Sequence, residues 1–313
     1  MTTGSFLTEM LMLYSIALLG FTARKTAVLN ENTNEVLTQL ILYITLPSLI
    51  LFSLDIPFSI SILKEFLWLI SMSAYIMLLS CLLAGLMRRR AQLPSKQKHV
   101  YESLIIFGNQ GFIGYAVCFI LFQEQGIIYL TIFNLWYLLL IWSYGIYLFT
   151  KTNKGINWKH VFLNPGILST LLGLVVLFSP LSWPSAISET LQEIGKMTIP
   201  LSMILIGSLM ANIQINVFPA MVRNSYLWKS VAVRLVIIPS LLFPFITMPV
   251  PDVLLIIAIL VSGMPSAPTI SLYSQKFGAD TSFATSGVLL TTLLCIFTIP
   301  LIYFVLTCIL TLI

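Results

Sequence analysis

Long apolar runs, each of about 18 or more residues, recur along the chain and constrain its fold more than any other feature. A run of this length lets a helix cross a bilayer whose hydrocarbon core is roughly 30 Å thick. Charged residues make up only 9% of the 313 residues, too few to cover the surface of a soluble domain of this size. The sequence therefore predicts an all-α polytopic membrane protein.

Polar breaks between the apolar runs divide the chain into ten predicted transmembrane helices. Their expected ranges are residues 5–23, 35–54, 66–87, 100–122, 127–149, 165–182, 188–211, 228–248, 252–275 and 282–312. Alternate loops hold 13 of the 16 Lys and Arg residues, among them Lys151, Lys154 and Lys159. Because cytoplasmic loops collect Lys and Arg, this asymmetry predicts that both termini are extracytoplasmic.

Matching features in the two halves of the chain predict two inverted five-helix repeats. Pro47 in TLPSLILFSL and Pro200 in TIPLSMILIGSL lie within the second and seventh predicted helices. The same separation in sequence that relates Pro47 to Pro200 also relates Asn109 to Ser262. Asn109 lies in the fourth helix of the first half and Ser262 in the fourth helix of the second half, and both of these helices contain disruptive residues. An odd number of helices in each half places the halves in opposite orientations. The predicted repeats span residues 1–150 and 151–313.

The fourth and ninth predicted helices contain residues that interrupt a membrane helix. Gly108, Gly111 and Gly114 make the fourth helix easy to unwind. Pro265 and Pro268 remove backbone donors from the ninth helix. The N–H and C=O groups of unwound backbone in a membrane must form hydrogen bonds with protein or with water in a cavity. The N-termini of half-helices carry partial positive charge and therefore attract carboxylates. The pattern predicts a secondary transporter with its site at the breaks. For the fourth helix alone, a close-packing face of glycines is the alternative.

These motifs resemble the auxin efflux carrier family, which includes plant auxin exporters and bacterial permeases for malate, malonate and similar acids. The resemblance rests on GNQGFIG at 108–114, on the LP and IP of the second and seventh helices, and on SGMPSAPTISLYSQKFG at 262–278. It covers most of the chain. It implies that helices 4 and 9 cross at their breaks, that helices 1, 2, 6 and 7 form a scaffold, and that helices 3–5 and 8–10 form a transport domain. It also implies a homodimer.

Tyr115 stands where family members often have a proline, which leaves the sharpness of the fourth-helix break open.

The candidate substrate-binding residues lie at the two breaks and in two further helices. Asn109 matches the position at which the family's asparagine contacts the substrate carboxylate, and Ser48 and Asn134 are looser candidates for the pocket lining. The predicted set is Asn109, Gln110, Gly111, Gly114, Ser262, Pro265, Ser266, Pro268, Ser48 and Asn134.

Glu102 and Arg234 are ionisable residues within predicted helices, where such residues are functional candidates. Arg234 would either attract an anion or extend to the cytoplasmic surface and bind lipid phosphate, and we favour the second interpretation. Glu102 would either carry a coupling proton or cap the N-terminus of its helix, and we favour capping.

The combined features predict a secondary active or facilitative transporter of small organic anions, either mono- or dicarboxylates or auxin-like acids, working by elevator-type alternating access. The alternative is a membrane sensor that binds a carboxylate on the same fold without net transport. An enzyme, a metal site and cofactors are not expected, because the 11 Asp and Glu residues are scattered and both His lie outside the predicted helices.

The expected partners are a small organic anion, the lipid bilayer and a second copy of the chain, with no nucleic acid. The expected location is the inner (plasma) membrane of a bacterium. The sequence leaves open which acid is carried, in which direction, and with which coupling ion.

Overall fold

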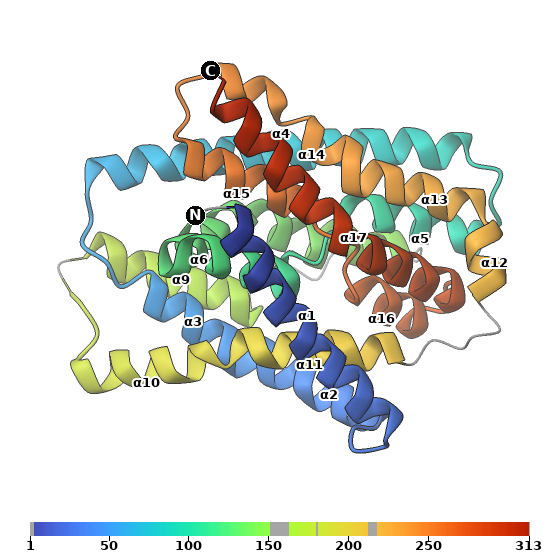
Figure 1. Ribbon diagram of the computed structural model, residues 1–313, viewed down its shortest axis with the longest axis horizontal. Helices are drawn as coiled ribbons and strands as arrows, with labels where there is room; N and C mark the ends of the chain where they lie inside the picture. The colour runs from blue at the N-terminus through green and yellow to red at the C-terminus, as the bar shows by residue number, and fades with distance from the viewer. Residues whose placement is uncertain (1–2, 151–162, 180, 212–217, 313) are drawn as a thin grey trace. The chain divides into compact units, whose positions relative to one another are not determined.

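The computed structural model describes residues 3–150, 163–179, 181–211 and 218–312, and among these residues there is no strand. The elements are, in order, α1 (Thr3–Lys25), α2 (Glu31–Leu40), η1 (Ile41–Thr45), α3 (Leu46–Ser53), α4 (Ile60–Arg90), α5 (Ser95–Ile106), η2 (Gln110–Gly114), α6 (Tyr115–Leu140), η3 (Ile141–Gly145), α7 (Ile146–Thr150), α9 (Pro165–Phe178), α10 (Ser185–Lys196), α11 (Thr198–Ala211), α12 (Phe218–Arg223), α13 (Ser225–Ala232), η5 (Val233–Ile237), α14 (Ile238–Ser240), η6 (Phe243–Thr247), α15 (Asp252–Ser262), α16 (Thr269–Lys276) and α17 (Thr281–Leu310) (Figure 1). The predicted all-α class is confirmed.

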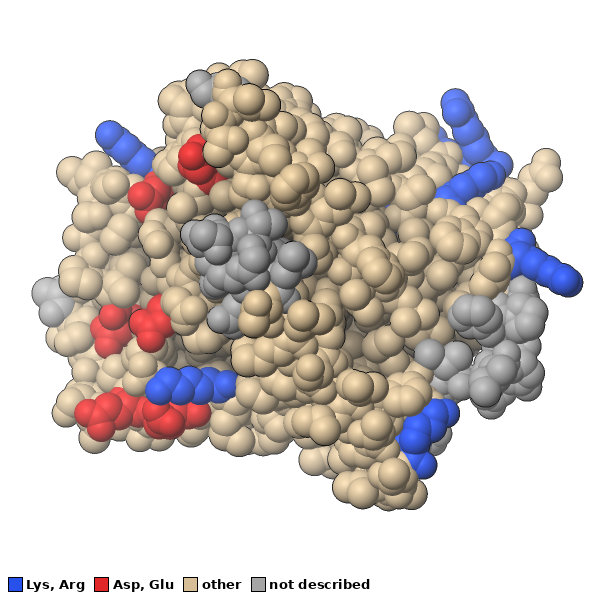
Figure 2. All heavy atoms as spheres, in the orientation of Figure 1, with Lys and Arg blue, Asp and Glu red and all other residues tan. Residues whose placement is uncertain are grey.

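Six segments of the described chain are helices long and apolar enough to cross a membrane. They are Asn32–Ser53, Ile60–Arg90, Gln110–Thr150, Ser185–Ala211, Ser225–Thr247 and Thr281–Leu310. On the face drawn in Figure 2, charged side chains are sparse. These features agree with a polytopic membrane protein, whereas ten helices and the orientation of the termini stay predictions. Lys151, Lys154 and Lys159, three of the loop residues on which the predicted orientation rests, lie outside the described residues.

The chain divides into two compact units, and each unit draws on both halves of the sequence. Unit 1 consists of Met1–Phe66, Gly111–Ile132 and Phe162–Gln214, and unit 2 of Leu67–Gln110, Phe133–Val161 and Ile215–Ile313. The boundaries fall within α4 and α6 and at Gln110 in η2.

Unit 1 is built on the close approach of α1 and α11, which lie side by side (Figure 1). Gly20 of α1 lies against the backbone of Ile204, and Gly207 of α11 lies against the backbone of Ala17. A methyl group at either glycine would overlap these atoms, so only glycine permits this separation.

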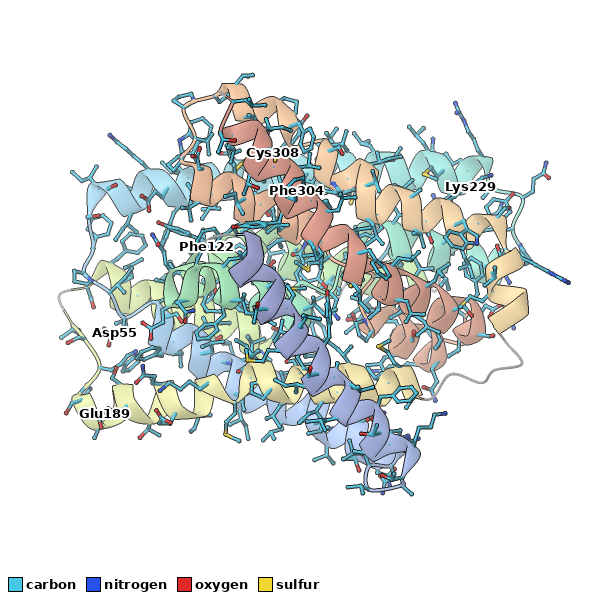
Figure 3. The ribbon with its side chains drawn as sticks, viewed as in Figure 1. Asp55, Phe122, Glu189, Lys229, Phe304 and Cys308 are labelled. Carbon is cyan, nitrogen blue, oxygen red and sulfur yellow. The ribbon has the colours of Figure 1, made fainter. Side chains whose placement is uncertain are left out.

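The loop before α10 is fastened to the end of α3 by Trp183 in unit 1. The Trp183 indole Nε1 donates to the Leu51 carbonyl at 3.3 Å, and its backbone N–H donates to Oδ2 of Asp55 at 3.2 Å. Asp55 is labelled in Figure 3. α3 also packs against α9, where Gly173 faces the Leu54 side chain.

Two prolines within the apolar segments, Pro47 and Pro239, are preceded by π-helical turns. η1 comes directly before α3, which contains Pro47, and η5 comes directly before α14, which contains Pro239. Because a proline lacks the N–H of a regular helical turn, a wider turn ahead of it lets the helix continue. Gln123 has φ 52°, so the helical axis kinks where the predicted fourth and fifth helices meet.

Candidate functional site

The two predicted helix interruptions are present, and they pair with each other within unit 2. α5 ends at Ile106 before η2 begins at Gln110, and α15 ends at Ser262 before α16 begins at Thr269. Gly108 and Ser266 form an antiparallel bridge. We call the paired segments, residues 107–109 and 263–268, the crossover.

Backbone hydrogen bonds hold the crossover together. The Asn109 N–H donates to the Pro265 carbonyl, and the Ala267 N–H donates to the Phe107 carbonyl at 3.0 Å. Each unwound segment therefore provides hydrogen-bond partners for backbone N–H and C=O groups of the other, and buried backbone in a membrane needs such partners.

Ser266 satisfies further backbone groups and is itself fully buried. Its Oγ donates to the Leu104 carbonyl at 2.7 Å, near the end of α5. Its N–H donates to Oγ1 of Thr291 in α17 at 3.0 Å. Ser266 thus links the end of α5 to α17 through the crossover.

Arg234 in η5 is 1% exposed and donates to carbonyls at the C-terminal end of α5 and just beyond that of α15. Its Nε donates to the Met264 carbonyl at 2.8 Å, and its Nη1 donates to the carbonyls of Ile106 at 3.0 Å and Ile105 at 3.2 Å. The favoured interpretation, extension to the surface, is therefore wrong. Carbonyls at a helix C-terminus have no partner within the helix and carry partial negative charge, so a buried cation is stabilised there.

Glycine at 108 makes room for this guanidinium. A methyl group there would overlap Nη2 of Arg234, whereas one at Gly111 would meet no described heavy atom within 4 Å. The close-packing interpretation of the fourth-helix glycines therefore applies to Gly108, whose packing partner is a charged side chain, and finds no support at Gly111.

Several polar atoms of unit 2 are buried without a hydrogen-bond partner among the described residues. They include Nη2 of Arg234, Oε1 of Gln110, Oγ of Ser262 and Oδ1 of Asn134. Buried polar atoms are usually satisfied by protein, water or ligand. These four are therefore among the atoms of unit 2 with capacity to bind a polar guest.

The other predicted site residues differ in how they are held. Pro268 lies directly before α16, and Gly114 is the last residue of η2. Ser48, which belongs to unit 1, donates its hydroxyl to the Ile44 carbonyl of its own helical segment at 2.8 Å. Tyr115, in the place of the expected proline, begins α6 and is hydrogen-bonded through its hydroxyl to Thr131 at 3.0 Å.

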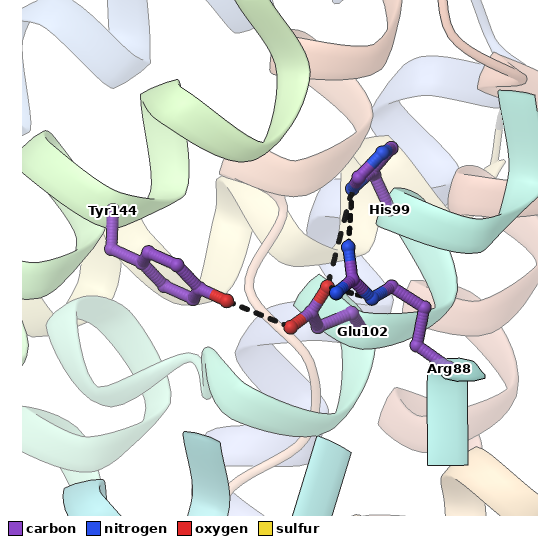
Figure 4. A network of polar contacts seen from close by, with 4 residues as sticks. All are labelled: Arg88, His99, Glu102 and Tyr144. Carbon is purple, nitrogen blue, oxygen red and sulfur yellow. Dashed lines mark hydrogen bonds and ion pairs between the residues drawn. The ribbon is translucent and has the colours of Figure 1, made fainter. Parts of the chain in front are cut away.

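Glu102 lies in the middle of α5, fully buried, rather than at its N-terminus. Its Oε2 is 3.0 Å from Nε of Arg88, its Oε1 accepts a hydrogen bond from Tyr144 at 2.8 Å, and Nδ1 of His99 is 4.0 Å from Oε2 (Figure 4). The capping interpretation is therefore wrong. A carboxylate in this position is compensated by a cation and a hydroxyl from other elements.

With this geometry established, comparison with known proteins places the chain in a family. A family model described as membrane transport protein matches residues 5–303. The chain belongs to this membrane transport family, which confirms the resemblance to auxin efflux carriers.

A distant relative extends over almost the same length. The uncharacterized transporter MJ1031 of Methanocaldococcus jannaschii is 23% identical over 296 residues, covering 88% of this chain and 91% of the relative.

Proposed function

We propose that the protein is a secondary transporter of small organic anions, with the anion bound at the crossover. The membrane transport family supplies the general function. The charges at the crossover favour an anion as the substrate.

The observation that carries this proposal is the position of Arg234. Each helix end carries roughly half an elementary charge, negative at the C-terminus and positive at the N-terminus. Arg234 donates to carbonyls at the end of α5 and just beyond the end of α15, so its charge is matched by those two C-terminal ends. The N-terminal ends that follow, at Gln110 and Thr269, keep about one positive charge between them.

Neither interrupted segment supplies an acidic residue to compensate these N-terminal ends. The segments 107–115 and 262–275 contain no Asp or Glu, and Arg234 makes no ion pair with any acid that the structure describes. A carboxylate from solution would supply the missing charge. Asn109, with the neighbouring Gln110, would add amide donors.

The proposed mechanism is elevator-type alternating access of ten helices in two inverted repeats, working as a homodimer in the inner membrane with both termini outside. The division into two compact units supports relative motion. Unit 1 contains the segments expected for the scaffold together with residues 111–132. The two repeats, the scaffold and the transport domain stay predictions.

The test is thermal stabilisation of detergent-purified protein by a panel of mono- and dicarboxylates, with neutral solutes and amines as controls. A ligand of the folded state raises its stability with the logarithm of ligand concentration. We expect one class of acid to stabilise the wild type and to lose at least about tenfold in affinity in Asn109→Ala, equivalent to about 1.4 kcal/mol. Asn134→Ala tests the looser candidate in the same way.

The unliganded melting temperatures of the variants show whether they still fold. Stabilisation by amines or neutral solutes but by no acid would overturn the carboxylate proposal. Uptake of the stabilising acid into proteoliposomes distinguishes a carrier from the sensor, which would bind without transport.

A further inference from the structure

We propose that a groove on unit 2 binds one acyl chain and the headgroup of an anionic phospholipid. The groove has a volume of about 720 Å³, and α4, α5, α6 and η3 provide its lining. Its lining residues are Ala74, Met77, Leu78, Cys81, Leu82, Gly85, Leu86, Arg88, Arg89, Glu102, Trp136, Leu140 and Tyr144.

One wall of the groove is a continuous apolar stripe along α4. Leu78, Leu82 and Leu86 recur every four residues, which places them on one helix face, and they are 62%, 55% and 53% exposed. Trp136 and Leu140, also four residues apart, line the groove from α6. Exposed apolar side chains on both sides suit an acyl chain.

The length of the apolar stripe matches one leaflet of a bilayer. At 1.5 Å per helical residue, the distance along α4 from Leu78 to Arg89 is roughly 16 Å. One leaflet contributes roughly 15 Å of hydrocarbon, half of the bilayer core. An acyl chain beside Leu78 would therefore bring its headgroup to the level of Arg89.

The charged end of the groove favours an anionic headgroup over a zwitterionic one. Arg88 is 3.0 Å from Glu102, so the positive charge of Arg88 is already matched (Figure 4). Arg89 is exposed and makes no ion pair with a residue that the structure describes. The end of the groove thus carries one unmatched positive charge, which suits a phosphate whose charge no choline offsets.

The neighbouring Arg90 provides a matched control. It is exposed and ends the same helix, but it does not line the groove. If general surface charge attracts anionic lipid, Arg89→Gln and Arg90→Gln should have equal effects. If the groove binds the lipid, only Arg89→Gln should matter.

The experiment titrates the detergent-purified full chain with dioleoyl phosphatidylglycerol, and separately with dioleoyl phosphatidylcholine, and measures bound lipid by native mass spectrometry. We expect phosphatidylglycerol to bind more tightly. Arg89→Gln should weaken phosphatidylglycerol binding about fivefold, the effect of one basic residue near an anionic lipid, and Arg90→Gln less than about twofold.

A second variant tests the apolar part of the groove. Leu82→Trp adds bulk at an exposed position and should weaken both lipids by obstructing the acyl chain, while glycerol phosphate, a headgroup without chains, should not bind measurably. Equal binding of the two lipids, equal effects of Arg89→Gln and Arg90→Gln, or full binding to Leu82→Trp would overturn the proposal. None of these measurements depends on which solute the protein transports.

Discussion

Gly207 of unit 1 and Gly108 of unit 2 are both glycines at close approaches, and their partners differ in kind. In unit 1, Gly207 of α11 lies against backbone atoms of Ala17 and Phe21 in α1. In unit 2, Gly108 lies against the guanidinium of Arg234. The first contact is ordinary packing of membrane helices through small residues. The second makes room for a buried charge.

This difference indicates that the crossover in unit 2 has a role besides stabilising the fold. Burying an ion has a cost of several kcal/mol that a close-packed apolar contact avoids. Arg234 offsets this cost with hydrogen bonds to three backbone carbonyls, at Ile105, Ile106 and Met264. Helix packing alone does not require a buried guanidinium with three carbonyl partners, so the crossover is the region of unit 2 where a function is expected.

The largest expected effect comes from removing the buried charge by Arg234→Leu. Three carbonyls would lose their donor in a buried site, and each unsatisfied group costs about 1–3 kcal/mol. We expect a loss on the order of 3–5 kcal/mol in the free energy of unfolding, measured as a large fall in melting temperature of the purified protein.

Two further substitutions separate charge from geometry at this position. Arg234→Lys keeps the charge but not the planar set of donors, so its effect should be intermediate. Arg223→Leu removes an exposed arginine in α12 and should change stability by less than about 0.5 kcal/mol. Wild-type stability in Arg234→Leu would show that the carbonyls do not depend on the guanidinium.

In unit 1, Gly207→Ala is expected to be the next most disruptive change. The added methyl group would overlap backbone atoms of α1, which cannot turn aside as a side chain can. Forcing α1 away from α11 should cost about 2–3 kcal/mol, again measured by thermal melting.

Gly111→Ala is the control for this packing effect, because a methyl group there meets no described heavy atom within 4 Å. It should leave the melting temperature close to that of the wild type. Equal melting temperatures for Gly207→Ala and Gly111→Ala would mean that α1 and α11 are not tightly packed in the membrane protein.

The helix interruptions could be predicted from the sequence because their causes are local. Pro265 and Pro268 act on the backbone of their own segment, and α15 ends at Ser262, shortly before them. The long apolar runs likewise predict helices without knowledge of their neighbours. The inverted-repeat pattern and the family resemblance both predicted that the two breaks meet.

The partners of Arg234 could not be predicted, because they are far away in the chain. The carbonyls of Ile105 and Ile106 lie 129 and 128 residues before it. An arginine in an apolar run signalled a functional position, but nothing in the sequence distinguished backbone carbonyls from lipid phosphate as its partner.

The interpretation of Glu102 failed because of a helix boundary. The sequence placed the start of the fourth helix at residue 100, whereas α5 begins at Ser95, after Pro94. Lys96 and Lys98, which the predicted ranges leave in a loop, lie in the first turn of α5. Glu102 therefore lies within the helix, where side chains from α4 and η3 reach it.

The smallest of the three effects is expected for Gly108→Ala, and it tests the comparison most directly. The added methyl group meets the end of a flexible side chain, so Arg234 can shift by giving up part of its hydrogen bonding. We expect a cost of about 1–2 kcal/mol in thermal melting experiments. Weaker stabilisation by the transported acid should accompany it.

Combining Gly108→Ala with Arg234→Leu determines why residue 108 is a glycine. If Gly108 makes room for the guanidinium, the alanine should cost less once Arg234 is gone, with a coupling energy on the order of 1 kcal/mol. Gly207→Ala combined with Arg234→Leu should instead be additive, since these residues belong to different units and share no partner. An equal cost of Gly108→Ala in both backgrounds would mean that the crossover backbone itself requires glycine. The contrast between a packing glycine and a charge-accommodating glycine would then fail.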